Sequence, residues 1–186
     1  AIPEVPETDT VEPDTEPDAT GPASLCTTPA SESWSFDDVA ANGSYLAGYV
    51  DFTLTDPSRP TAAHGGLPEA ASRTLSLRVW YPAVRGALGD LTPQLLAPLA
   101  RADGPFPLVV HSHGFSSNKA ELAYAGEWLA TRGWVFAALE FPLSNISTLG
   151  GPQVVDVVNQ PADVSFAIDE LLGRNAVSSD ALFGAI

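Results

Sequence analysis

Residues 107–118, Pro-Leu-Val-Val-His-Ser-His-Gly-Phe-Ser-Ser-Asn, decide the fold class that we predict for this chain. The apolar run at 108–110 has strand character and ends in His-Ser-His-Gly-Phe, after which a helical pattern begins. Where a buried strand turns into a helix through a His-Gly pair, the backbone N–H of the next residue can be left free to hydrogen-bond an oxyanion. Here that residue is Phe115, so the stretch predicts one backbone donor of an acyl-transfer site.

Two upstream segments, 48–55 and 73–80, alternate apolar and polar residues, as do strands with one solvent-exposed face. This pattern favours an antiparallel pair at the edge of a sheet. Tyr81-Pro82 is expected to end the second strand. The inward-facing positions predicted by the alternation are Val50, Phe52 and Leu54 in the first segment and Leu75, Leu77 and Val79 in the second.

The pattern downstream is that of parallel strands joined by helices. Strand 107–112 is apolar on both faces, as a central parallel strand should be. Asn118 followed three residues later by Glu121 predicts a capping box, and Gly133 predicts the end of that helix. Residues 134–139 then form the next buried strand, which makes a strand-helix-strand crossover.

A second helix is predicted over 161–172, with Pro161 at its start and Gly173 at its end. By the alternation another strand should follow, and we expect it beyond the last residue given. The predicted fold class is therefore α/β: an antiparallel edge pair followed by parallel strand-helix-strand units, incomplete in this chain.

Composition separates residues 1–33 from residues 34–186. The first segment repeats proline and acid with no Lys or Arg, so we expect an extended, disordered linker, either a tether or a solubilising spacer. The single cysteine, Cys26, is a free thiol or pairs outside the sequence given. Residues 34–186 have the composition of a globular domain.

The net charge of −15, with 8 basic against 23 acidic residues, argues against nucleic acid or an anionic membrane surface as a partner. No apolar run is long enough to span a bilayer. The chain contains no Met, so we expect a trimmed or mature product. It shows no signal peptide, which is consistent with one already removed from a protein that is secreted, periplasmic or at the cell surface.

His111 and His113 form a His-x-His pair that could in principle ligate zinc. No Cys, His or Asp cluster completes such a site, so we expect no metal and no cofactor. The preferred interpretation of His113 is structural: its ring hydrogen-bonds loop backbone and, together with Gly114, holds the turn.

The candidate substrate-binding residues are Phe115, Ser116, Phe141 and Ile146. The Phe115 ring either walls an acyl pocket or folds back into the core. The long loop 141–159 follows the neighbouring strand and contains Phe141, Leu143 and Ile146. These residues either line the opening of the same acyl pocket or pack on a helix. Asn145-Ile146-Ser147 is also a short acceptor sequon, which matters only in a eukaryotic secretory route.

Three stretches resemble a known group of enzymes: 73–82, 107–119 and 129–140, with Asp56-Pro-Ser-Arg59 resembling its first turn. They look like the N-terminal half of secreted α/β-hydrolase serine esterases, of the platelet-activating-factor-acetylhydrolase-like and polyester-hydrolase or cutinase-like groups. The resemblance covers roughly residues 45–180. It implies that the Phe115 N–H serves an oxyanion hole and that an aromatic ring there stacks on substrate.

The chain departs from these families because it contains no Gly-x-Ser-x-Gly sequence. The resemblance places the serine, the acid and the base further downstream, so we expect this chain alone to be inactive. Its expected partners are that downstream segment, either in the same polypeptide or as a second chain, and an ester substrate. Two alternatives remain open: a non-catalytic binding or scaffold protein on the same sheet, and a peptidase of the same fold.

Overall fold

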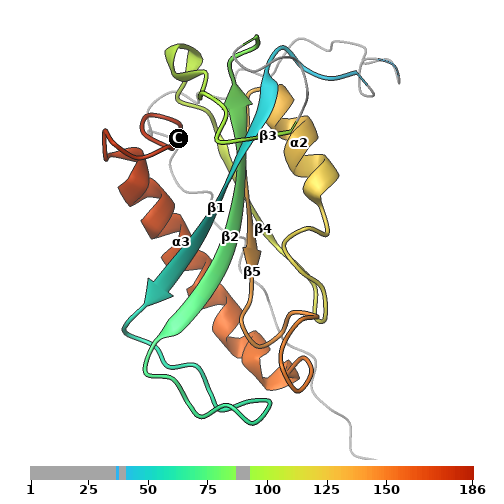
Figure 1. Cartoon of the computed structure of the whole chain (residues 1–186), viewed down its shortest axis with the longest axis vertical. Coiled ribbons are helices and arrows are strands. Elements are labelled where there is room, and N and C mark those ends of the chain that lie inside the picture. The colour runs from blue at the N-terminus through green and yellow to red at the C-terminus, as the bar shows by residue number, and fades with distance from the viewer. Residues whose placement is uncertain (1–36, 38–40, 87–92) are drawn as a thin grey trace, which may run out of the picture. The chain divides into compact units, whose positions relative to one another are not determined.

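A mixed five-stranded sheet organises the part of the chain that the computed structural model describes, residues 37, 41–86 and 93–186 (Figure 1). The strand order is β3-β1-β2-β5-β4. The predicted linker at 1–33, with Cys26, lies outside the described residues. The strands are β1 (Leu46–Asp56), β2 (Arg73–Ala83), β3 (Gln94–Leu95), β4 (Leu108–Ser112) and β5 (Val135–Glu140).

The predicted antiparallel pair is confirmed. Strands β1 and β2 pair from Leu46 opposite Ala83 to Asp56 opposite Arg73. Strand β2 also pairs with β5, and the short β3 pairs with β1, so neither long strand is at the edge of the sheet. The predicted inward residues of both strands are buried, except Phe52, which is partly buried against the same core.

The prediction that Tyr81-Pro82 ends the second strand is wrong, because β2 continues to Ala83. Proline lacks only the N–H donor, and its carbonyl can still accept a hydrogen bond. The Pro82 carbonyl accepts one from the Ala100 N–H at 2.9 Å.

The strand-helix-strand unit is confirmed: β4 and β5 are parallel and are joined through α2 (Ala123–Thr131). The prediction that this helix starts at Asn118 is wrong, because α2 begins five residues later. The residue before α2, Leu122, provides no side-chain cap. The Asn118 Oδ1 instead accepts from the Ala120 N–H at 2.8 Å, which makes a local turn. Gly133 follows the helix with φ of +85°, a conformation that favours glycine.

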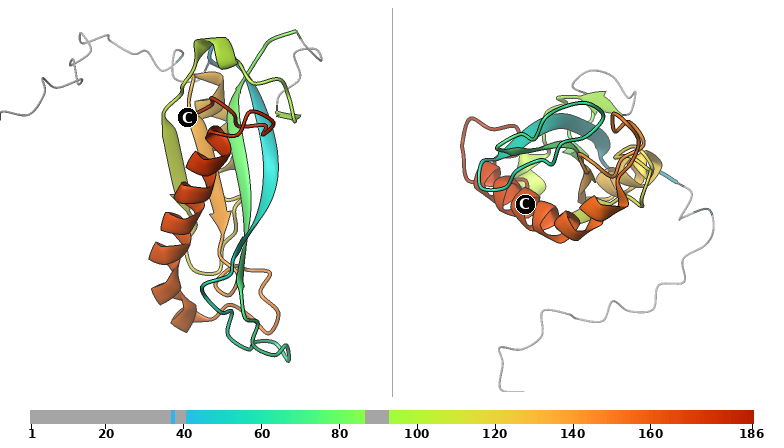
Figure 2. Two further views of the ribbon diagram at one scale, coloured as in Figure 1. Left: turned by 90° about the vertical axis from the view of Figure 1, so that its left-hand side faces the viewer. Right: turned by 90° about the horizontal axis from the view of Figure 1, so that it is seen from below.

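Helices cover both faces of the sheet (Figure 2). On one face, α3 (Gln160–Asn175) packs Ala167 and Leu171 on the main core. On the other, α2 packs Ala130 against Trp80 and Phe136. The predicted start of α3 at Pro161 is confirmed, whereas Gly173 lies inside the helix and does not end it. Two 3₁₀ segments, η1 (Arg101–Asp103) and η2 (Val154–Asn159), complete the elements.

Strand β4 is half-buried and pairs with β5 alone among the described strands. Its residues were predicted to lie in a central strand. In this structure its other edge presents backbone N–H and C=O groups that have no strand beside them. Within the described residues, no helix has the length and apolar character needed to cross a bilayer.

Candidate functional site

The turn that follows β4 leaves one backbone donor free. The Ser117 N–H donates to the Gly114 carbonyl at 3.1 Å and so closes the turn around Phe115 and Ser116. The Phe115 N–H makes no hydrogen bond within the described part of the chain. Ser116 has φ of +64°, a strained conformation for a residue other than glycine, and such strain persists only where surrounding contacts enforce it.

The buried side chain of His113 stabilises this turn. Its Nδ1 lies 2.7 Å from the Gly114 carbonyl oxygen, and its Nε2 accepts from the Phe141 N–H at 3.2 Å. The two contacts assign the proton to Nδ1, because Nε2 must accept. Both ring nitrogens are therefore occupied, as expected for a structural histidine and not for a metal ligand.

The loop after β5 braces the same turn. The Ser116 N–H donates to the Ser144 carbonyl at 2.9 Å, and the Ile146 N–H donates to the Ser117 carbonyl at 2.8 Å. Ser144 is fully buried, and its hydroxyl accepts from Gln160 Nε2 at 2.9 Å. A chain of contacts thus links the first residue of α3 to the residue after Phe115.

The predicted substrate-binding residues divide into two groups. Phe115 and Ile146 are 51% and 59% exposed on adjoining loops, and Ser116 is exposed between them. Phe141 is 0% exposed and packs its ring on His113 with centroids 5.0 Å apart. The expectation that Phe141 lines the opening of the pocket is therefore corrected: its side chain belongs to the core, where it supports the turn.

Asn145 is also buried, and its amide nitrogen donates to the Phe141 carbonyl at 2.6 Å. A nitrogen in that position is inaccessible to a modifying enzyme, so the sequon at 145–147 is not a glycan acceptor in the folded chain.

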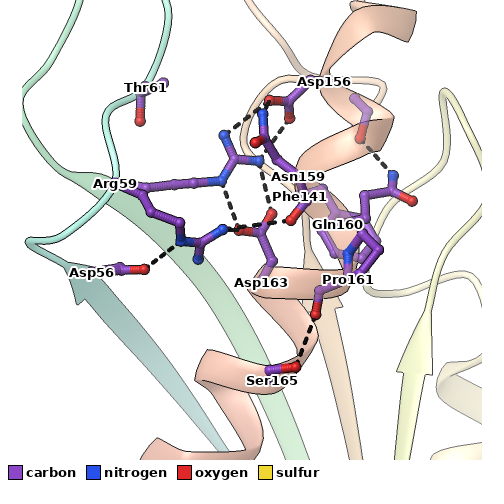
Figure 3. Close-up of polar contacts among 12 residues, drawn as sticks. Asp56, Arg59, Thr61, Phe141, Asp156, Asn159, Gln160, Pro161, Asp163 and Ser165 are labelled. Carbon is purple, nitrogen blue, oxygen red and sulfur yellow. Dashed lines mark hydrogen bonds and ion pairs between the residues drawn. The ribbon is translucent and has the colours of Figure 1, made fainter.

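A buried network of arginines and aspartates, which the sequence reasoning missed, fixes the loops beside the turn (Figure 3). Arg73 is 1% exposed and donates two hydrogen bonds to Asp156 and two to Asp163, at 2.7–3.0 Å. Arg59 bridges Asp56 and Asp163 at 2.6 and 2.7 Å. The network ties the loop between β1 and β2 to η2 and α3, the segment that carries Gln160.

The electrostatics of this network favour the ionised forms. The Ser58 hydroxyl and Arg59 both donate to Asp56 and lower its pKa to about 2, against the opposing effect of burial. Burial alone would lower the pKa of Arg73, but its hydrogen bonds with Asp163 and Asp156 outweigh that effect and raise it. The signal in the sequence was the Asp56-Pro-Ser-Arg59 turn, although its partners are about 100 residues away.

His111 does not join His113 in a site. Its ring stacks on Phe136 at 6.0 Å, and burial lowers its pKa despite Glu121, whose carboxylate lies 3.7 Å from Nε2. Within residues 37, 41–86 and 93–186, no three His, Cys, Asp or Glu side chains are grouped so that they could hold a metal ion.

No protein-family model matches the chain, and no curated protein matches it. Among solved structures, a ferulic acid esterase from Streptomyces cinnamoneus superposes with a TM-score of 0.56 and 23% identity over 70% of this chain. The chain has an α/β-hydrolase-like fold. It spans about half the length of that esterase, because the match covers 48% of it. The likeness bears out the fold implied by the resemblance without distinguishing the two esterase groups named above.

Proposed function

We propose that this chain supplies the oxyanion-binding half of a serine-dependent carboxylic ester hydrolase. The observation that carries the proposal is the free N–H of Phe115, held on a braced turn at the carboxyl end of a parallel strand. In open α/β sheets this is the edge where ligands bind. A donor positioned in advance contributes roughly 10²–10³ in kcat. The fold shared with a ferulic acid esterase supports an ester as the substrate class.

The remaining catalytic groups are proposed to come from polypeptide downstream of this chain. A serine there attacks the ester carbonyl, a histidine takes the serine proton and passes it to the leaving alcohol, and an acid orients that histidine. Water then cleaves the acyl-enzyme by the same route. Phe115 N–H and a second donor next to the serine hold the oxyanion. In support, no ring nitrogen of His64, His111 or His113 contacts a serine hydroxyl in the described part.

The free edge of β4 is the proposed docking position of that downstream segment. Strand β4 pairs with β5 alone among the described strands, and a strand edge without a partner offers unpaired N–H and C=O groups to another strand. A strand paired there would place its own carboxyl end beside the turn at 113–117, because parallel strands end at the same edge of a sheet.

The substrate is proposed to be an ester with a bulky apolar or aromatic part. Phe115, which carries the free donor, and Ile146, on the adjoining loop, are exposed apolar residues. In the same loop, the Gln153 N–H donates to the Leu143 carbonyl at 2.7 Å just before η2 begins. Val154, Val155 and Val158 of η2 are 67%, 73% and 80% exposed. An apolar surface of this kind favours an apolar acyl or aryl group over a charged one.

Labelling with a fluorophosphonate probe tests the proposal on the protein isolated with any polypeptide that accompanies it. We expect the label on polypeptide downstream of this chain, together with hydrolysis of p-nitrophenyl butyrate and methyl ferulate. Intact mass spectrometry before and after labelling locates the modified polypeptide. A peptide p-nitroanilide series serves as the control for a peptidase.

Absence of labelling and of ester turnover in folded material would favour the non-catalytic binding protein and contradict the proposal. Faster turnover of peptides than of esters would favour the peptidase of the same fold. Labelling of a serine within residues 1–186 would show that the nucleophile was assigned to the wrong part of the protein.

A further inference from the structure

An open pocket of about 520 Å³ lies against α2, apart from the turn after β4. It is within the size range of small-ligand sites. Helix α2 covers the opposite face of the sheet from α3 (Figures 1 and 2). None of the pocket residues takes part in the hydrogen bonds around Phe115. The lining residues are Asn42, Tyr124, Ala125, Glu127 and Trp128.

The pocket presents two aromatic side chains one helical turn apart. Tyr124 and Trp128 are four residues apart on α2, a spacing that puts both on one side of the helix. Tyr124 is 71% exposed, and the small Ala125 leaves room beside the rings. The exposed Tyr124 ring and the partly buried Trp128 ring offer apolar surface, so a ligand that covers them gains apolar contact.

The segment that follows Asn42 is anchored to the helix. The Gly43 N–H donates to Thr131 Oγ1 at 2.9 Å, and the Tyr45 N–H donates to the Thr131 carbonyl at 3.0 Å. A Cβ on Gly43 would lie 2.0 Å from the Thr131 carbonyl oxygen, so only glycine permits this approach. Asn42, which precedes Gly43 and also lines the pocket, is therefore held close to α2.

The charges around the pocket select the class of ligand. The Arg132 guanidinium carbon lies 4.1 Å from the centre of the Trp128 ring, and its Nη1 donates to the Ala41 carbonyl at 2.8 Å. A cation already on Trp128 opposes binding of a second one, and the Glu127 carboxylate opposes an anion. In the described part of the chain, neither that carboxylate nor the Tyr124 hydroxyl makes a hydrogen bond.

We propose that this pocket binds a neutral saccharide. Sugar rings have apolar C–H faces that can pack on the exposed Tyr124 ring beside Trp128, and hydroxyl groups that can pair with the Glu127 carboxylate and the Asn42 amide. The site would hold the protein on a polysaccharide at a distance from the proposed ester-cleaving turn. The inference does not depend on that activity.

Affinity electrophoresis of the full-length protein in native gels tests the proposal. The gels contain neutral arabinoxylan, β-glucan or galactomannan, and we expect retardation by at least one. Tyr124→Ala should weaken the association about tenfold, since it removes the most exposed ring, whereas Tyr124→Phe should retain it. Leu172→Ala, at an exposed position of α3 on the other face, is the matched control and should bind as the wild type does.

Three results would overturn the proposal. One is the absence of retardation in all three gels by protein whose circular dichroism shows it to be folded. Another is equal retardation of the wild type and Tyr124→Ala. The third is calorimetric binding of choline chloride that Tyr124→Ala and Glu127→Gln abolish, because it would make the pocket an organic-cation site. Since Tyr124 is mostly exposed, the variants should fold, and loss of ester turnover in them is not expected.

Discussion

Replacement of Asp163 tests whether the buried network stabilises the site. Asp163 is 0% exposed and accepts three hydrogen bonds of 2.7 Å, from Arg73 Nε, Arg73 Nη2 and Arg59 Nη1. Breaking a buried ion pair by removing one partner costs about 3–5 kcal/mol. We expect Asp163→Ala at the lower end of that range, because two arginines and two aspartates then remain and their charges balance.

Arg73→Ala should cost more than Asp163→Ala. Without Arg73, the three carboxylates of Asp56, Asp156 and Asp163 face only Arg59, so buried negative charge is left without a partner. The cost belongs at or above the upper end of the same range of about 3–5 kcal/mol. The order of the two variants is therefore a prediction that follows from the charges alone.

The assay is equilibrium unfolding in urea at pH 7, followed by circular dichroism and tryptophan fluorescence on the protein as isolated. Asp51→Ala is the matched control, because Asp51 also pairs with an arginine through two hydrogen bonds, but both side chains are partly exposed. It should cost less than about 1 kcal/mol. Equal losses for Asp163→Ala and Asp51→Ala, or a smaller loss for Arg73→Ala than for Asp163→Ala, would refute the reasoning.

The other predictions concern the turn, the pH response and the sheet edge. Phe115→Ala keeps the N–H and should raise KM for bulky esters with little change in kcat. Phe115→Pro removes the donor and should lower kcat by roughly 10²-fold or more. Unchanged steady-state constants in both variants would show that Phe115 is not at the site. Gln160→Ala removes the hydrogen bond to Ser144 and should lower kcat while KM stays constant, and a change in KM alone would contradict a positioning role. Because the folded pKa of Asp56 is lowered to about 2, its contribution to stability is present above pH 4 and lost as pH falls toward 2. Asp56→Asn should therefore destabilise at pH 7 and make little difference near pH 2 in urea titrations, and an equal effect at both values would argue against the ionised contacts. Residues 1–186 expressed alone should expose apolar surface beside the free edge of β4 and so bind a hydrophobic dye, and this binding should be lost when the downstream segment is supplied. A sharp cooperative melt without dye binding would contradict the proposal that a further strand pairs with β4.

From the sequence we predicted the position of the turn in the candidate site, but not the placement of all of its side chains. The His-Gly pair after a strand pointed to Phe115, whose N–H the structure leaves free. The same reasoning placed Phe141 at the opening of the pocket, yet the ring lies in the core. Both residues follow a strand, and their local sequences do not differ in a way that separates them. Phe141 lies in the main core and packs on His113, which comes 28 residues earlier and accepts from the Phe141 N–H.

The sequence by itself determined those features that are encoded within a few neighbouring residues. Period-two alternation predicted the inward faces of β1 and β2, and Pro161 marked the start of α3 because its ring suits a first turn and no other part of a helix. Even within a few residues, however, one side chain can fit two local structures, and the sequence then predicts the wrong one. Asn118 uses its side chain for a turn to Ala120, so the expected capping box does not form and α2 begins later.

Only the tertiary structure decided which loops meet at the edge of the sheet. Arg73 lies 83 residues from Asp156 and 90 from Asp163 in sequence, and Arg59 lies 104 from Asp163. Each of these residues alone is an ordinary charged side chain, whose usual place is the surface. They can be buried because folding brings opposite charges together, and a charge is buried at a tolerable cost only beside such a partner. No pattern confined to neighbouring residues contains that information.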